Sequence, residues 1–189
     1  MYKKIPLEQS LTILQRYEVG EECLALIDGS MPPNEVVSQL QSAKLDNDLV
    51  QFLCHALPVR EVIWWACLAL ELRQQDWTPQ QTNAIVCAKN WVKEPDEANR
   101  RQAEHFVKNI GHDCAPGWLA QAVFWNGSGS ITDVGESVVM PPENLYAKAA
   151  AGAINMASIM PEWDNSEAYY QKVIEMGLDL ANGGSGNVR

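Results

Sequence analysis

Basic side chains are scarce in this chain of 189 residues. It has 14 Lys and Arg against 24 Asp and Glu, which gives a net charge of -10. Binding nucleic acid requires a basic surface that neutralises phosphates, so no nucleic-acid partner is expected. The same charge disfavours attachment to anionic membranes. It favours instead the approach of a protein partner with a basic surface.

Long apolar runs are also missing. The stretch Val62–Leu70 is apolar and uncharged but has only nine residues, about half of what a bilayer-spanning helix requires. Near the start of the sequence, Glu8 and Gln9 interrupt any apolar segment of the kind found in signal peptides. We therefore expect a cytoplasmic protein without a membrane span.

The sequence lacks the paired cysteine and histidine spacings of metal sites and disulfide scaffolds. Its five cysteines are odd in number, and four of them lie within apolar helical patterns, where free cysteine behaves as a small buried hydrophobe. The glycine-serine run that follows Asn126 lacks the lysine and the strand-loop-helix context of a phosphate-binding loop. We expect no metal, no cofactor and no small-molecule ligand.

What the sequence does contain is helical periodicity along most of its length. Thr78-Pro79-Gln80-Gln81 is typical of a helix N-terminus, with a threonine cap, proline at the first position and glutamine at the third. We further predict that Asp46 and Asp113 cap helices, and that the last helix ends near Gly177. Only Ser137–Met140 has a strand-like pattern. The prediction is an all-α, single-domain irregular helical bundle of about nine or ten helices, with residues 1–181 as the domain and 182–189 as a flexible tail.

One helix, at about residues 58–75, is predicted to lie at the centre of this bundle. Apolar side chains of Val62–Leu70 point in every direction of a helical wheel, which is typical of a buried helix. Trp64 and Trp65 are adjacent, so their side chains project about 100° apart and face different neighbours. Other helices must therefore cover this one on at least two sides.

His112-Asp113-Cys114 is the most enzyme-like cluster in the sequence. A thiol in the first turn of a helix predicted to run from Cys114 to Trp125 could be stabilised as a thiolate by the helix dipole, with a histidine nearby. Residues two apart in a turn rarely reach each other as a catalytic pair, however. Because no other catalytic constellation is present, we predict a protein that is not an enzyme, with a cysteine-dependent enzyme using Cys114 as an alternative.

The longest segment without helical periodicity, residues 127–142, is the strongest candidate for an interface. It carries Val138, Val139 and Met140, which could add to a groove or sheet edge of a partner or pack back on their own domain. Trp125 and Trp163 lie at helix edges beside loops, and tryptophan is enriched in interface hot spots. Their alternative role is to cover the core.

Several segments together resemble a bacterial family of unknown function. The paired-tryptophan segment Ala56–Ala69 carries most of the resemblance, which extends from about Asp46 to Gly183. The other similar segments are Asn99–Arg101, Ala115–Ala120, Phe124–Ser130, Pro141–Leu145 and Gly177–Ala181. Members of that family are frequently encoded beside type VI secretion genes. The resemblance therefore implies a context and transfers no catalytic residue.

These observations predict a non-enzymatic accessory or adaptor protein of a bacterial type VI secretion system. It would act by binding a protein partner, such as a secretion component or an effector. A second hypothesis is an immunity protein that neutralises a neighbouring toxin, since such a protein would also be small, acidic and cytosolic.

Overall fold

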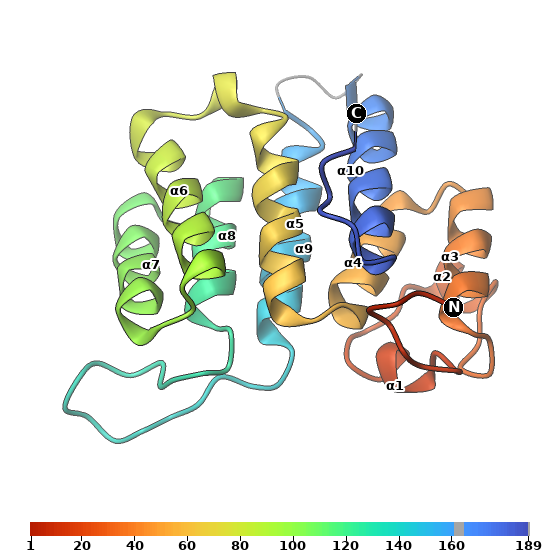
Figure 1. Cartoon of the computed structure of the whole chain (residues 1–189), viewed down its shortest axis with the longest axis horizontal. Helices are drawn as coiled ribbons and strands as arrows, with labels where there is room; N and C mark the ends of the chain where they lie inside the picture. The colour runs from red at the N-terminus through yellow and green to blue at the C-terminus, as the bar shows by residue number, and fades with distance from the viewer. Residues whose placement is uncertain (161–164, 189) are drawn as a thin grey trace.

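The computed structural model describes residues 1–160 and 165–188, and within them the protein is all-α, as predicted (Figure 1). These residues form ten α-helices and one 3-10 turn, with no strand. The helices are α1 (Leu11–Leu14), α2 (Glu21–Leu24), α3 (Pro33–Ser42), α4 (Asp46–Ala56), α5 (Val59–Glu71), α6 (Pro79–Lys93), α7 (Glu97–Ile110), α8 (Ala115–Phe124), α9 (Leu145–Ala157) and α10 (Ser166–Ala181), and the 3-10 turn is η1 (Gln74–Asp76).

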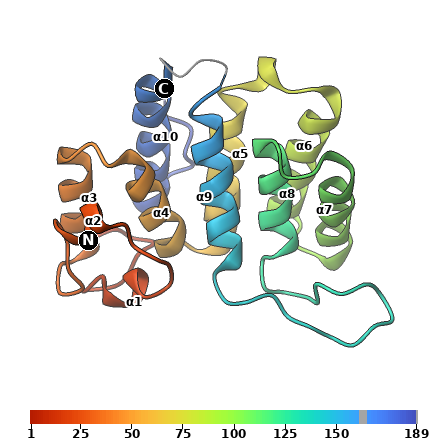
Figure 2. The same ribbon diagram turned by 180° about the vertical axis from the view of Figure 1, so that it is seen from behind.

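Helix α5 lies at the centre, as the apolar run predicted. Helices α6, α7 and α8 lie on one side of it and α4 and α10 on the other, while α9 packs along its length (Figures 1 and 2). Trp65 is fully buried, and its indole Nε1 donates a hydrogen bond to the Val173 carbonyl of α10 at 2.8 Å. Trp64 is half-buried, and its Nε1 donates to the Ser185 carbonyl at 2.8 Å. The two indoles therefore face different neighbours, as their adjacency in a helix requires.

Helix α9 also lies at the centre of the bundle, where its small side chains allow close packing against its neighbours. Ala149, Ala150 and Ala153 are buried in α9, which packs against α5 and α8. Short side chains let two helix backbones approach closely, so α9 contacts α4, α5 and α8 together. The N-terminal helices α1 and α3 then pack against α4.

The predicted helix ends are correct in one place and wrong in three. Thr78 and Gln81 form the expected capping box at the start of α6. Helix α8 begins at Ala115 with Cys114, not Asp113, at the N-cap, and Leu45 rather than Asp46 precedes α4. Helix α10 continues past Gly177 to Ala181, because this glycine serves for close packing and not for termination.

The glycine-rich composition of residues 182–189 favours a flexible tail, but the described part of it, residues 182–188, folds back across α5. The Gly186 amide donates to Asp179 Oδ2 at 2.8 Å, and the Ser185 carbonyl accepts the hydrogen bond from Trp64. These contacts place the C-terminal residues over the half-buried face of Trp64. None of the described helices combines the length and the apolarity that crossing a membrane would take.

Candidate functional site

The segment between α8 and α9 leaves the helical body and returns to it as an extended loop (Figures 1 and 2). We call residues 127–142 the arm. Its two sides are joined by a backbone hydrogen bond from the Ile131 amide to the Val139 carbonyl at 2.8 Å. The Val139 amide donates to Ser130 Oγ at 3.0 Å, and Thr132 Oγ1 donates to the Ser137 carbonyl at 2.8 Å. The arm is thus a loosely paired hairpin whose two sides are held largely by side chains.

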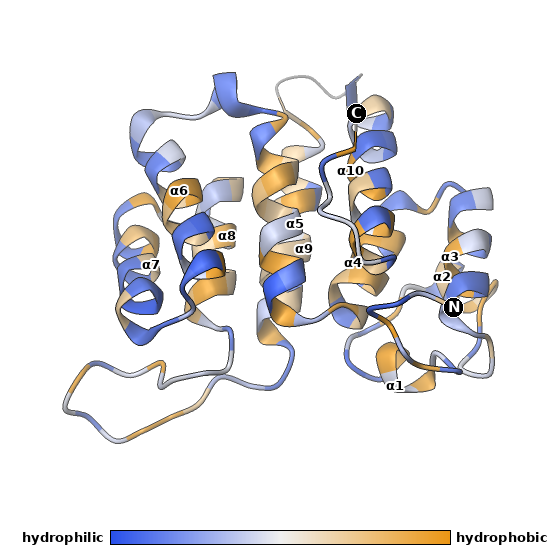
Figure 3. Ribbon diagram, in the orientation of Figure 1, coloured by the Kyte–Doolittle hydropathy of each residue, from blue (hydrophilic) through white to orange (hydrophobic). Residues whose placement is uncertain are grey.

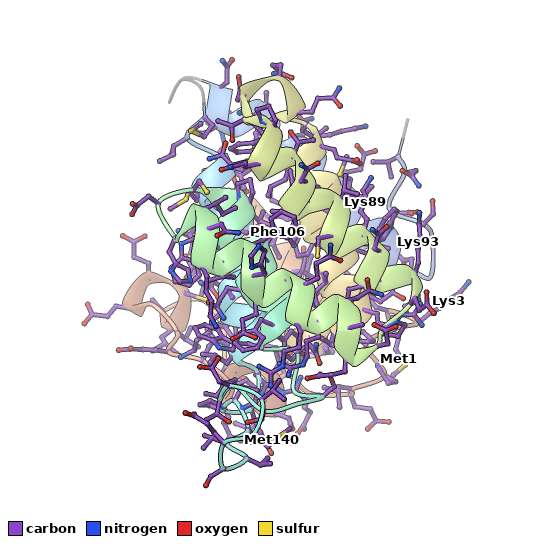
Figure 4. The ribbon with its side chains drawn as sticks, turned by 90° about the vertical axis from the view of Figure 1, so that its left-hand side faces the viewer. Met1, Lys3, Lys89, Lys93, Phe106 and Met140 are labelled. Atoms are coloured by element: carbon purple, nitrogen blue, oxygen red, sulfur yellow. The ribbon has the colours of Figure 1, made fainter. Side chains whose placement is uncertain are left out.

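Four apolar side chains of the arm face solvent. Val134 is 88% exposed, Val138 is 76% exposed, and Val139 and Met140 are each 48% exposed. Figure 3 shows hydrophobic stretches along the ribbon of the arm, and Figure 4 places Met140 at the edge of the molecule. Val138, Val139 and Met140 thus lie at the surface and do not pack into the domain. Trp163, the remaining candidate, lies outside the described residues.

Val134 was not singled out from the sequence, although its place could have been inferred. It lies between Asp133 and Gly135 in the sequence Asp133-Val134-Gly135-Glu136, which is typical of a turn. Gly135 has a φ of 97°, in the left-handed region. An apolar side chain at the second position of such a turn has no core to enter, so it points outward.

The base of the arm is held by a buried arginine. Arg100 of α7 is fully buried, and its guanidinium donates to the Phe124 carbonyl and to the Ser130 carbonyl, each at 2.9 Å. Glu97 accepts two further hydrogen bonds from Arg100, at 2.6 and 2.7 Å. Hydrogen bonding by Arg100 lowers the pKa of Glu97 to about 2. A Cβ at Gly129 would lie 2.8 Å from Arg100 Nη2, so the backbone of the arm approaches the guanidinium closely.

The tip of the arm is attached much more weakly than the base. Lys108 of α7 makes an ion pair with Asp133 at 3.3 Å, and both side chains are largely exposed. Exposed ion pairs contribute about 0–1 kcal/mol. The arm is therefore held firmly at its base by Arg100 and only weakly at its tip. No local pattern in the sequence indicates this role of Arg100.

Trp125 lies at the base of the arm between two surface grooves. The first, which we call the α1 groove, has a volume of about 800 Å³ and is lined by α1 and by residues on both sides of the arm's base, including Trp125, Met140 and Tyr146. The second has a volume of about 460 Å³ and runs between the arm and α7, with Trp125 and Ile131 in its lining. Trp125 and Met140, both predicted as interface residues, are thus brought together in one groove.

The α1 groove also contains a cation. Arg16 lines it, and its Nη1 donates to the His55 carbonyl at the end of α4. Among the described residues, no carboxylate lies within ion-pair distance of Arg16. Burial raises the pKa of Tyr146, and the nearby charge of Arg16 opposes this effect.

A buried histidine supports the wall of this region. His55 is fully buried in the last turn of α4, where its Nδ1 donates to the Gln51 carbonyl at 2.8 Å. The ring of Tyr17 stacks on it with 4.5 Å between centroids. Burial, the largest effect, lowers the pKa of His55 from its ordinary value of 6.5 to about 4. His55 is therefore neutral at physiological pH.

His112, the histidine of the cysteine-enzyme hypothesis, contacts two residues of α8. His112 Nε2 lies 2.9 Å from Gln121 Oε1, and the His112 ring packs on Trp118 with 4.8 Å between centroids. Within residues 1–160 and 165–188, no hydrogen bond joins His112 to Cys114. The same described residues bring together no group of three His, Cys, Asp or Glu side chains that could hold a metal ion.

Comparison with known protein families places most of the chain in one of them. A family model described as "Family of unknown function (DUF6931)" matches residues 36–181, which is most of the chain and includes α5, Arg100 and the whole arm. No curated protein and no solved structure matches the chain.

Proposed function

We propose that this chain, which belongs to the DUF6931 family of unknown function, docks on another protein through its arm. One observation carries the proposal: exposed apolar side chains project from a segment whose base is fixed by Arg100. Apolar groups that remain exposed in a folded protein are typical of interaction sites. A fixed base also lowers the entropy that is lost when a loop becomes ordered on binding.

The arm supports docking by addition to an edge or a groove of the partner. In the described structure, neither the amide nor the carbonyl of Val138 is used in a hydrogen bond, so both are free to pair with a neighbouring strand. Extended segments bind sheet edges through such main-chain groups, while alternate side chains provide specificity. Val138 and Met140, two residues apart, would then lie on the same face.

The charge of the arm points to a partner of opposite sign. Asp133 and Glu136 are its only charged residues, and both lie at the tip beside Val134. An apolar surface flanked by carboxylates complements an apolar cleft rimmed by lysine or arginine. The overall charge of -10 would increase the rate at which such a partner is encountered at low ionic strength.

We further propose that this partner is a component or an effector of a type VI secretion system, which the protein serves as an adaptor. The support for this placement is the resemblance of Ala56–Ala69 and the other quoted segments to a family often encoded beside such genes. An immunity protein would use the same surface, because occluding a toxin also requires an exposed and partly fixed apolar segment.

A quantitative affinity capture with matched variants tests the docking surface. Val138→Asp places a charge on the arm, and Val86→Asp places the same charge on α6, where Val86 is 48% exposed. We expect one protein to be captured by the wild type and by Val86→Asp, and to be lost with Val138→Asp. Equal capture by the wild type and both variants would exclude the arm as the docking surface.

The identity of that protein then tests the context. Recovery of a secretion component or an effector supports the adaptor. Recovery of a toxin encoded nearby supports the immunity protein instead, and deletion of the gene for this chain would then be lethal only while the toxin gene is intact.

A further inference from the structure

We infer that the α1 groove binds an extended peptide segment that carries a single carboxylate next to an aromatic or aliphatic side chain. The inference rests on the proposed function, because the groove borders the arm and the segment would belong to the protein on which the arm docks. The groove would form a second contact with the partner. In this contact a side chain of the partner binds in the groove, whereas at the arm the side chains of this protein bind to the partner.

Arg16 supplies the charge that selects the ligand. Its Nη1 is used by the His55 carbonyl, which fixes the direction of the side chain. Nε and Nη2 form no hydrogen bond with any described residue, and a guanidinium presents its donors in a fixed fork that matches a carboxylate. Arg100 and Arg101, by contrast, are already paired with Glu97. Arg16 is thus one of several basic side chains that have no carboxylate partner among the described residues.

The walls of the groove supply an apolar surface for the neighbouring side chain. Trp125 and Tyr146 are half-buried, so part of each ring faces the groove, and Met140 contributes a flexible apolar side chain. Aromatic rings offer a large contact area with little loss of conformational freedom. The volume of about 800 Å³ is within the range of pockets that hold ligands, roughly 300–1,000 Å³.

Two amide side chains can bind the backbone of an extended segment. Asn144 lies at the N-cap of α9 in the left-handed conformation, with a φ of 59°, and makes no side-chain capping hydrogen bond. Gln15 is exposed on the rim. An amide both donates and accepts, as a peptide backbone does, so this pair favours a peptide over a ligand without backbone amides.

One carboxylate also lines the groove and limits the charge of the ligand. Glu143 is exposed beside Pro142 and Asn144, and it would repel a second acidic group. A segment with one carboxylate is attracted by Arg16 at small cost, whereas an acidic run is not. Removing the charge of Arg16 should therefore weaken peptide binding, and removing the charge of Glu143 should strengthen it.

A peptide selection on the full-length protein tests this inference. The probe is a displayed library of random 12-residue peptides, and the affinity of selected peptides is measured by fluorescence anisotropy. We expect the selected peptides to share one Asp or Glu beside an apolar residue. Arg16→Gln should weaken their binding about tenfold or more, since hydrogen bonds to charged groups contribute about 1.5–3 kcal/mol.

Three further variants make the result specific to the groove. Glu143→Gln should strengthen binding a few-fold, and Arg16→Lys, which keeps the charge but not the fork, should bind between the wild type and Arg16→Gln. Arg60→Gln is the matched control, because Arg60 lies on α5 and donates to the Val92 carbonyl, away from the groove. Circular dichroism of each variant shows that it folds.

The outcomes separate this inference from the docking of the arm. Val138→Asp should leave peptide affinity unchanged, so Arg16-dependent peptide binding would stand even if no partner docks on the arm. Selected peptides that are basic, or that bind Arg16→Gln as well as the wild type, would overturn the inference. The inference would also be overturned if the molecular mass in solution increased with protein concentration and Arg16→Gln abolished this increase. The groove would then hold a second copy of the chain.

Discussion

Arg100 of α7 donates a hydrogen bond to the Ser130 carbonyl at 2.9 Å, and this contact joins the helical body to the arm. The same guanidinium donates to the Phe124 carbonyl at the end of α8. A single buried side chain therefore fixes both the exit of the chain from α8 and its first turn into the arm. The account of docking depends on this contact, because an arm without a fixed base would lose more entropy on binding.

Replacing Arg100 with alanine should destabilise the protein by about 1–3 kcal/mol or more, the cost of leaving a buried carbonyl without its donor. The buried Phe124 carbonyl and the partly buried Ser130 carbonyl would lose their donor, and Glu97 would lose its main partner. The measurement is urea unfolding followed by circular dichroism. Arg101→Ala is the control, since Arg101 is less buried than Arg100 and its hydrogen bonds go to carboxylates and to no backbone carbonyl, so its loss should cost less. An equal loss of stability in the two variants would contradict the proposal that Arg100 fixes the base of the arm.

A methyl group at Gly129 should loosen the arm without unfolding the helices. Its Cβ would lie 2.8 Å from Arg100 Nη2, so the guanidinium or the arm must move. We expect faster hydrogen exchange at the Ile131 and Val139 amides in Gly129→Ala, with unchanged exchange in α5. Unchanged exchange at those two amides would contradict the role of the close approach.

Two helical glycines should respond to alanine with opposite signs. At Gly177 a Cβ would lie 2.6 Å from Trp65 Cζ2, and overpacking costs about 1–3 kcal/mol. At Gly152 in α9 the nearest atom, on Trp118, is 4.0 Å away, and alanine should stabilise the helix by about 0.5–1 kcal/mol. Thermal unfolding compares the two variants. A stabilising Gly177→Ala would mean that α10 can shift away from α5.

These two glycines illustrate what the sequence could and could not predict. The apolar run of α5 and the capping residues of α6 are local signals, because period and cap chemistry lie within a few neighbouring residues. Gly177 was expected to end a helix, which is the common local role of glycine. Its actual role, contact with Trp65, depends on a residue more than one hundred positions away and has no local signal.

The candidate site shows the same division. The loss of helical periodicity indicated a loop at residues 127–142, but it left open whether Val138 and Met140 face solvent or pack on their own domain. The contacts of Arg100 with Ser130 and the presence of Arg16 beside Trp125 and Tyr146 could not be predicted, since they join segments that the fold brings together.

Stability should fall as the pH is lowered from 6.5 to 4, because of His55. In the unfolded chain this histidine takes up a proton below its ordinary pKa of 6.5, whereas in the folded protein its pKa is lowered to about 4. The unfolded state therefore binds more protons in this range, and the loss amounts to about 3 kcal/mol at the acid end. Urea unfolding at several pH values measures it.

His55→Gln should flatten that pH dependence between 6.5 and 5, where few carboxylates titrate. The exposed His105 provides the control, and His105→Gln should retain the slope of the wild type. An identical slope in the wild type and His55→Gln would show that the buried ring is not the group responsible.

The most direct test of docking is site-specific photo-crosslinking in cells, with p-benzoylphenylalanine in place of Val138 or of Val86. The two valines are both exposed, on the arm and on α6 respectively. We predict a single protein adduct from position 138 that is absent from position 86 and that disappears in the Gly129→Ala background. No adduct from position 138, or the same adducts from both positions, would contradict the proposal that the arm binds a partner.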